Sequence, residues 1–229
     1  MPEKVALVTG ANGGLGTHVT KALLDADFFV AGLAPRILPK DFDHPNFTAV
    51  SATLNDLDEA RKVVDNLIAK FNRIDLLVHT VGGFAGGQTV AETDDATWQR
   101  MFDMNLNSTF HILRAVIPHM RSARSGRIVA IGSRAAESPG AKVGAYSASK
   151  AAVVSLLRTV AIENKDLGIT ANIILPGTID TPANRAAMPG ADTSTWVKPE
   201  SIASLILWLA GGAGKEVTGA AIPVYGQGL

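Results

Sequence analysis

The chain has 229 residues and 21 basic against 21 acidic side chains, which argues against a nucleic-acid partner because phosphate contacts need a basic excess. Hydrophobic residues make up 47% and charged residues 18%, so the chain can build one substantial core and does not resemble a disordered protein. The absence of cysteine excludes disulfides, zinc thiolate sites and thiol nucleophiles.

Short runs rich in branched residues alternate with longer amphipathic segments along the whole chain. The short runs predict strands at Lys4–Thr9, Phe28–Leu33, Phe47–Ser51, Ile74–Thr80, Gly126–Gly132, Ile169–Leu175 and Ala220–Val224. Helical apolar spacing predicts helices at Asp56–Phe71, Asp94–Met120, Ala145–Asn164 and Pro199–Leu209. Because such strands need helices on both faces of a parallel sheet, we expect a doubly wound α/β fold of about seven parallel strands, with residues 1–229 in a single domain.

Three segments interrupt this alternation. Ala34–Asn46 contains three prolines, so a second crossover helix is not expected there. Gly82–Gly87 is rich in glycine, and Pro176–Trp196 has three prolines without a strong period, so both are predicted loops. Because ligands of open parallel sheets bind beyond the carboxyl ends of the strands, both loops are expected to border a ligand site.

A glycine-rich loop follows the first predicted strand and opens a helix. Its spacing, T-G-x-x-x-G-x-G from Thr9 to Gly16, lets the backbone turn tightly and approach a pyrophosphate at the helix start. The alternative interpretation is an ordinary strand-to-helix turn. The predicted dinucleotide contacts in this loop are Gly10, Asn12, Gly13, Gly14, Leu15 and Gly16.

The second predicted strand ends in Gly32-Leu33-Ala34-Pro35-Arg36, without the acid that would bind the ribose of NAD. Arg36, together with Lys40, could bind the 2′-phosphate of NADP, and both could equally be solvated loop charges. The sequence therefore favours NADP(H) as the cofactor and leaves NAD(H) open.

Tyr146 and Lys150 are four residues apart, which places them side by side on one face of the predicted helix. A nearby ammonium lowers the pKa of a phenol, and this lets a tyrosine act as an acid or base nearer neutral pH. Ser133 follows the fifth strand, where its hydroxyl could bind a carbonyl oxygen. The alternative interpretation of Tyr146 and Lys150 is a pair of side chains that face solvent on a helix. The order of the glycine loop, Ser133 and this pair along the chain indicates a catalytic site more specifically than the spacing of the pair alone.

The sequence resembles the short-chain dehydrogenase/reductase family over nearly its whole length, which implies a Rossmann-like fold and hydride transfer between a nicotinamide and a carbonyl or alcohol carbon. The residues that carry the resemblance are Thr9-Gly10, Gly14, Gly16, Asn105 in Met104-Asn105-Leu106, Ser133, Tyr146, Lys150, and Pro176-Gly177 followed by Thr181.

The resemblance implies a role for each of these side chains. Tyr146 would donate or accept the substrate proton, and Ser133 would orient the substrate oxygen. Lys150 would hold the nicotinamide ribose and lower the pKa of Tyr146. Asn105 would support a water in a proton relay, although an asparagine near a helix bend can simply satisfy backbone groups. The implied cofactor contacts also include Val81, Gly82, Pro176, Gly177, Ile179 through its backbone, and Thr181.

Two positions depart from the family pattern. The family's Asn-Asn-Ala-Gly reads His79-Thr80-Val81-Gly82 here, and we expect His79 to have a structural or cofactor-packing role. Thr53 stands where the family often has an acid that contacts the adenine. The other histidines lack metal-ligand spacing, so no metal is predicted.

The loops Val81–Gly87 and Leu175–Trp196 are also similar to those of dihydropteridine reductases, which reduce quinonoid dihydropterins. Those enzymes commonly lack the serine found here as Ser133 and usually keep an acid at the position of Leu33. Residues 183–196 are predicted to fold over the substrate as a lid, with an ordered surface loop anchored by Trp196 as the alternative.

Three functions remain open from the sequence. The first is an NAD(P)(H)-dependent oxidoreductase acting on a small carbonyl or secondary alcohol, with 3-oxoacyl thioesters as one candidate. The second is a dihydropteridine reductase-like enzyme. The third is a non-catalytic dinucleotide-sensing regulator, which would be expected to lose Tyr146 or Lys150.

The two longest predicted helices, Asp94–Met120 and Ala145–Asn164, carry more apolar surface than one sheet face should cover. Family members pair these helices between subunits, so a homotetramer or homodimer is expected, with Thr218–Leu229 as a further candidate contact. Deep burial within one chain is the alternative.

The longest apolar stretch, Ile202–Ala210, is far shorter than the roughly 20 residues of a membrane span. We therefore expect a cytoplasmic protein with a small-molecule substrate and no membrane or nucleic-acid partner.

Overall fold

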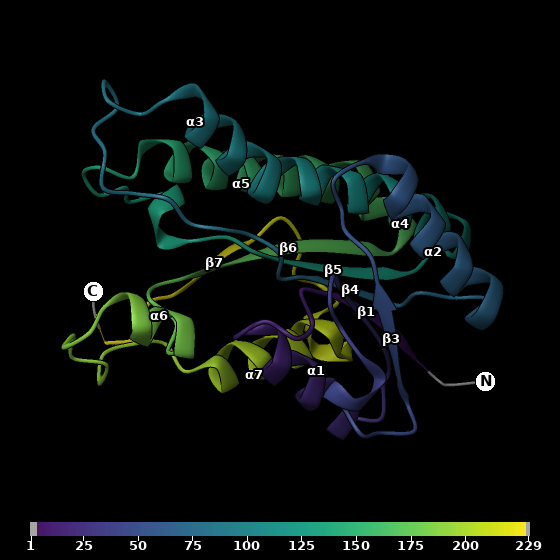
Figure 1. Ribbon diagram of the computed structural model, residues 1–229. Coiled ribbons are helices and arrows are strands. Elements are labelled where there is room, and N and C mark those ends of the chain that lie inside the picture. Colours follow the sequence, from purple (N-terminus) through teal and green to yellow (C-terminus); the bar gives the residue numbers. More distant parts are fainter. Residues whose placement is uncertain (1–3, 228–229) are drawn as a thin grey trace.

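The computed structural model of the chain describes residues 4–227 and has one parallel sheet between two layers of helices (Figure 1). The strand order is β3-β2-β1-β4-β5-β6-β7, and every neighbouring pair is parallel. The strands are β1 (Val5–Thr9), β2 (Phe29–Ala34), β3 (Phe47–Ser51), β4 (Leu76–His79), β5 (Gly126–Ile131), β6 (Ile169–Pro176) and β7 (Ala221–Val224). All seven predicted strands are present with shifts only at their ends, so the doubly wound fold is confirmed. The last two residues of the predicted contact segment Thr218–Leu229 lie outside the described residues.

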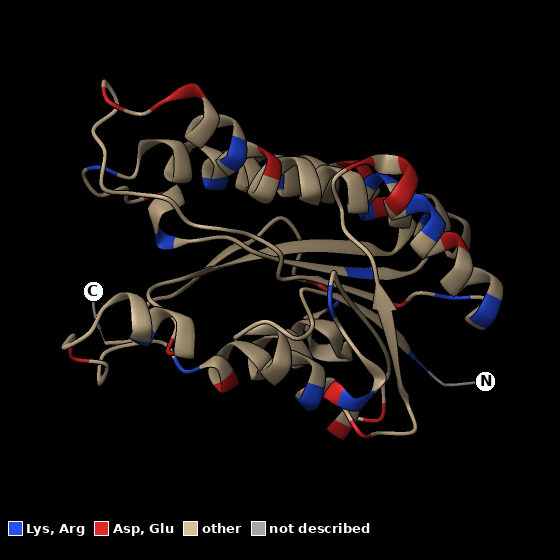
Figure 2. Ribbon diagram, in the orientation of Figure 1, with Lys and Arg blue, Asp and Glu red and all other residues tan. Residues whose placement is uncertain are grey.

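The helices cover both faces of this sheet, as Figure 1 shows. On one face lie α2 (Leu57–Phe71), α4 (Ser108–Ala123) and α5 (Gly144–Asn164), and on the other lie α1 (Gly16–Asp25) and α7 (Pro199–Ala210). Side chains of β1 alternate between the two layers: Val5 and Leu7 pack with the first group, Ala6 and Val8 with the second. Covering both faces explains why the strands read as continuous apolar runs. Charged residues lie mainly on the outer sides of the helices and in loops (Figure 2).

The segment predicted as one helix over Asp94–Met120 is helical but changes its winding in the middle. α3 (Asp95–Phe102) runs into a π-helical segment at Asp103–Asn107, and α4 follows at once. The wider π turn places Asn105 toward the interior, where it is 1% exposed.

The predicted loops differ in outcome. Ala34–Asn46 holds only a short 3₁₀ turn at Pro39–Asp41, as its prolines predicted. The loop predicted over Pro176–Trp196 is wrong in part, because it contains the helix α6 (Pro182–Ala187). Thr181 begins α6 by accepting a hydrogen bond from the amide of Asn184 at 3.3 Å, and Pro182 occupies the first helical position. Among residues 4–227, no helix has the length and apolar character to cross a membrane.

Candidate active site

Ser133 and Tyr146 meet beyond the carboxyl end of β5. Ser133 lies two residues beyond the end of that strand, and its Oγ accepts a hydrogen bond from the amide of Ala135 at 3.1 Å. Tyr146 lies in the first turn of α5, close enough to Ser133 that the serine side chain acts to lower the pKa of its phenol. The structure therefore brings together two hydroxyl groups that could bind one substrate oxygen.

Lys150 lies one turn further along α5 and is only 5% exposed. Its Nζ donates a hydrogen bond to the carbonyl of Ile131, the last residue of β5, at 3.0 Å. Burial lowers the pKa of Lys150 to about 8. Burial also raises the pKa of Tyr146, while the side chain of Ser133 acts in the opposite direction. The sequence predicted that Lys150 lowers the pKa of Tyr146, and this is wrong: burial raises that pKa, and the contribution that lowers it comes from Ser133.

Asn105 joins the loop after β4 to α5 through its side-chain amide. Its Oδ1 accepts a hydrogen bond from the amide of Gly83 at 2.9 Å, and its Nδ2 donates to the Gly83 carbonyl at 3.1 Å. The same Nδ2 donates to Ser149 Oγ at 3.0 Å. These contacts favour the structural interpretation of Asn105, in which its side chain satisfies backbone groups.

The segment Val81–Gly82 passes close to both Asn105 and Lys150. A Cβ atom on Gly82 would lie 2.8 Å from Asn105 Oδ1 and 3.0 Å from Lys150 Nζ. Glycine is therefore the residue that lets this backbone lie against the two polar side chains.

The glycine-rich loop forms a tight cradle before α1. Gly10 has a φ of +71°, and its amide donates to the carbonyl of Leu33 in β2 at 2.7 Å. A Cβ atom on Gly16 would lie 1.9 Å from the Gly10 carbonyl oxygen, so no larger residue fits at the helix start. The first amides of an α-helix have no partner within the helix, and they carry its positive dipole end. The cradle therefore fits the pyrophosphate of a dinucleotide.

The segment after β6 closes against this cradle. A Cβ atom on Gly14 would lie 2.9 Å from Thr181 Cβ, and Gly177 is held by its amide, which donates to Val224 at 2.9 Å. The carbonyl of Ile179 accepts hydrogen bonds from Asn184 Nδ2 at 2.8 Å and from the Thr181 amide at 2.9 Å. A carboxamide held here would thus use the Ile179 amide rather than its carbonyl.

The far end of the cradle is polar and exposed. Arg36 and Lys40 are solvent-exposed, and Asn12 Nδ2 lies 3.5 Å from both the Arg36 carbonyl and Asp41 Oδ2. Asp41 Oδ2 also accepts a hydrogen bond from the Leu38 amide at 3.0 Å. Sequence reasoning missed Asp41, whose position depends on the 3₁₀ turn. An acid and two bases therefore share the region where the adenosine ribose is expected.

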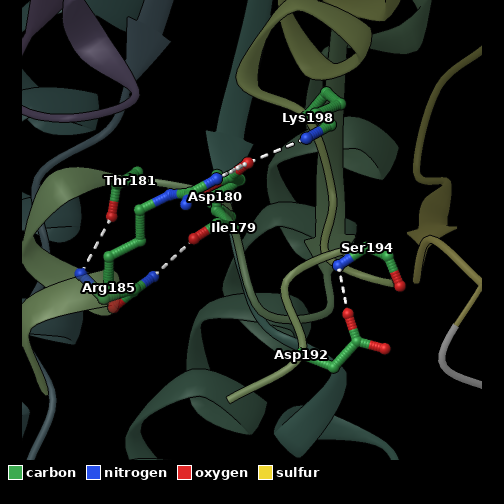
Figure 3. A network of polar contacts seen from close by, with 8 residues as sticks. Ile179, Asp180, Thr181, Arg185, Asp192, Ser194 and Lys198 are labelled. Carbon is green, nitrogen blue, oxygen red and sulfur yellow. Dashed lines mark hydrogen bonds and ion pairs between the residues drawn. The ribbon is translucent and has the colours of Figure 1, made fainter. Parts of the chain in front are cut away.

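An ion-pair cluster ties the two ends of the predicted lid together (Figure 3). Asp180 accepts from Arg185 Nε at 2.5 Å and from Arg185 Nη2 at 2.9 Å, and its Oδ2 lies 2.8 Å from Lys198 Nζ. These two cations hold the pKa of Asp180 well below its usual range. The sequence analysis did not identify this cluster, because Lys198 lies beyond the loop and joins Asp180 only in the fold.

His79 is a buried, neutral residue beside the site. Its Nδ1 lies 2.8 Å from Thr9 Oγ1, and its Nε2 has no hydrogen-bond partner among the described residues. Burial and the charge of Lys150 lower the pKa of His79 to about 3. This environment supports the predicted structural role. Within residues 4–227, no three His, Asp, Glu or Cys side chains are grouped in a way that could hold a metal ion.

Comparisons with known proteins give a consistent result. The family model described as short chain dehydrogenase matches residues 4–191. The short-chain dehydrogenase/reductase cdmF of Talaromyces verruculosus is 31% identical, over 98% of this chain and 96% of its own length. The 3-oxoacyl-[acyl-carrier-protein] reductase FabG of Salmonella typhimurium is 28% identical, over 97% and 96%. The Pseudomonas aeruginosa RhlG/NADP active-site complex superposes with a TM-score of 0.89 at 29% identity, covering 100% of this chain and 96% of that one.

Proposed function

Because the chain belongs to the short-chain dehydrogenase/reductase family, whose members are oxidoreductases acting on CH–OH or C=O groups, we propose that it interconverts a small carbonyl compound and a secondary alcohol with NADP(H). The observation that carries this proposal is the proximity of the Ser133 and Tyr146 side chains, with the buried Lys150 one helical turn further along α5. A 3-oxoacyl thioester is one candidate substrate, as the name of the Salmonella relative suggests.

In this proposal each side chain acts on a stated atom. A nicotinamide cofactor supplies the hydride when it is bound. The hydroxyls of Ser133 and Tyr146 donate hydrogen bonds to the substrate oxygen and orient the carbonyl. Tyr146 gives its proton to that oxygen as the alcohol forms, and the ammonium of Lys150 stabilises the phenolate that remains. In the oxidative direction the phenolate of Tyr146 takes the proton back.

The cofactor would lie along the cradle formed by Gly10, Gly13, Gly14 and Gly16. The exposed cations Arg36 and Lys40 favour a 2′-phosphate and hence NADP(H), and RhlG is a relative whose structure contains NADP. Asp41 favours the free ribose hydroxyl of NAD(H), which stays the alternative. The Ile179 amide and Thr181 would bind the carboxamide.

We also propose that residues 1–229 form a single cofactor-binding and catalytic domain that assembles as a homotetramer or homodimer. Phe110 on α4 and Ile162 on α5 are 43% and 71% exposed, which supports pairing of these helices between subunits.

Residues 183–196 would act as a substrate lid, and the Asp180 ion pairs would hold the base of this lid.

A fluorescence titration with NADPH and NADH in parallel tests the cofactor, followed by turnover of an acetoacetyl thioester and of quinonoid dihydropterin. We expect tighter binding of NADPH, and turnover of the thioester that Tyr146→Phe abolishes. Faster turnover of the dihydropterin would favour a dihydropteridine reductase-like enzyme and leave Ser133 without a role. Binding of cofactor with no turnover of either compound would favour the regulator.

A further inference from the structure

The exposed aromatic ring of Phe84 contacts the ring of Tyr146 and has no part in the proposed proton transfer. The ring of Phe84 is 5.0 Å from that of Tyr146, centroid to centroid, and meets it edge-on at 74°. Phe84 is nevertheless 68% exposed. A large apolar side chain that contacts the proposed proton donor and also faces solvent needs an explanation.

The glycines of the loop after β4 fix Phe84 in this place. A Cβ atom on Gly86 would lie 2.9 Å from Phe84 Cζ and 3.2 Å from Val143 Cγ1, so the ring folds back over its own loop. Gly87 has a φ of +102°, and its amide donates to the Lys142 carbonyl at 2.9 Å. The loop is thereby attached to Lys142 and Val143, the two residues that come just before α5 and Tyr146.

Two more exposed apolar side chains lie against the segments that carry Phe84 and Tyr146. Val90 is 78% exposed, and its Cγ2 lies 2.9 Å from where a Cβ atom of Gly144 would be. Met104 is 40% exposed, and its Cε lies 2.5 Å from where a Cβ atom of Gly83 would be. We call Phe84, Val90 and Met104 the apolar rim. Exposed apolar groups gathered beside polar reacting groups are typical of a ligand site.

We propose that Phe84 determines substrate specificity, and that the apolar rim binds a flat apolar group attached to the reacting carbonyl, as in an aryl ketone or aryl 3-oxo ester. This inference rests on the proposed function, since it concerns the substrate of the same site. An aryl group beside the carbonyl would cover the exposed part of Phe84 while its carbonyl oxygen reaches Tyr146 and Ser133. Aromatic rings in such contact gain energy beyond the apolar area that they bury.

Two esters with the same reacting group test the proposal. Ethyl benzoylacetate and ethyl acetoacetate are both 3-oxo esters and differ in carrying a phenyl or a methyl group on the reacting carbonyl. With NADPH, we expect kcat/KM to be about tenfold higher for the phenyl ester, in line with one aromatic contact. Phe84→Ala should remove this preference through KM of the phenyl ester, and Phe84→Tyr should keep it. Trp208→Ala, which removes another exposed aromatic from α7, should leave it unchanged.

Calorimetry without turnover gives a second readout. Titrating ethyl benzoylacetate into protein saturated with NADP⁺, which cannot reduce it, should show affinity about tenfold weaker in Phe84→Ala than in the wild type. An equal loss of kcat on both esters would instead make Phe84 a support for Tyr146 and overturn the proposal. Equal turnover of both esters by the wild type would overturn it while leaving the proposed function intact. No turnover of either ester despite NADPH binding would contradict the proposed function, and this inference with it.

Discussion

The two ends of the candidate site are built in different ways. At the chemical end, Tyr146 and Lys150 project from a long helix, and Lys150 is fixed by a hydrogen bond to the Ile131 carbonyl. At the adenosine end, Arg36 and Lys40 are exposed in a loop that contains only one 3₁₀ turn. Buried, bonded groups hold a defined geometry, whereas exposed charges are screened by solvent and salt. The comparison teaches that the reaction type can be inferred from the first region more firmly than cofactor preference from the second.

The largest effect is expected from Tyr146→Phe. This variant keeps the ring and its contact with Phe84 and removes only the hydroxyl that we propose as proton donor. Because a positioned acid or base contributes about a hundredfold to ten-thousandfold in rate, kcat should fall by at least about a hundredfold. Steady-state kinetics with the acetoacetyl thioester measure the change, and a titration should show NADPH affinity within about twofold of the wild type. Turnover within tenfold of the wild type would mean that Tyr146 is not the donor.

Lys150 offers a test through pH at the same end of the site. Its pKa of about 8 in the folded protein lies below the ordinary 10.5, so between these values the unfolded chain binds more protons. The stability of the wild type relative to Lys150→Met should therefore rise as pH increases from 8 to 10.5, by on the order of 3 kcal/mol. Urea unfolding at a series of pH values measures this difference. A flat difference across that range would mean that the folded protein does not depress the pKa.

The same lysine predicts the direction of the activity profile. If the ammonium is the active form, its contribution is complete below the folded pKa of about 8 and is lost as pH rises through that value. kcat/KM, which reports the free enzyme, should fall on the alkaline side near this pH in the wild type. Lys150→Met should be at least about tenfold slower at pH 7 and should lack that alkaline decline.

The smallest effect is expected at the adenosine end, from Arg36→Ala. Removing one exposed cation should weaken NADPH binding by about tenfold or less and leave NADH binding nearly unchanged. The loss should shrink as salt is added, because exposed charges are screened. Parallel titrations at low and high salt measure it, with Lys165→Ala, an exposed cation at the C-terminal end of α5, as a matched charge control. Equal weakening of NADPH and NADH binding would mean that Arg36 does not bind the 2′-phosphate.

The sequence predicted the strands well because strands buried on both faces are mostly apolar, and every residue of β1 and β6 is buried. The sequence analysis missed α6. This helix has only 6 residues, too few to show a helical period of apolar residues, and its only local sequence signals are the N-cap Thr181 and the following Pro182. Spacing and order predicted a site formed by Tyr146, Lys150 and Ser133. The fold brings Ser133 close to Tyr146, with Lys150 one turn along the same helix, and their roles stay a prediction. The sequence analysis did not foresee that the Asn105 amide would bind the Gly83 backbone, since that contact joins residues 22 positions apart.

Contacts that depend on tertiary packing were also beyond local patterns. The cluster of Asp180, Arg185 and Lys198 forms only because α6 returns beside the start of α7. Burial, which no spacing rule measures, sets the pKa of Lys150 and raises that of Tyr146. Residue types at the site could thus be predicted, whereas their protonation required the fold.

The central claim is that a hydride passes to a carbonyl carbon held at Ser133 and Tyr146. The most direct test is a reaction of the protein with an acetoacetyl thioester and NADPH deuterated on the transferable position of the nicotinamide C4, with mass analysis of the product. We predict a 3-hydroxyacyl thioester with one deuterium on the carbinol carbon, and no such product from Tyr146→Phe on the same timescale. Unchanged thioester and cofactor, although NADPH is shown to be bound, would contradict the account.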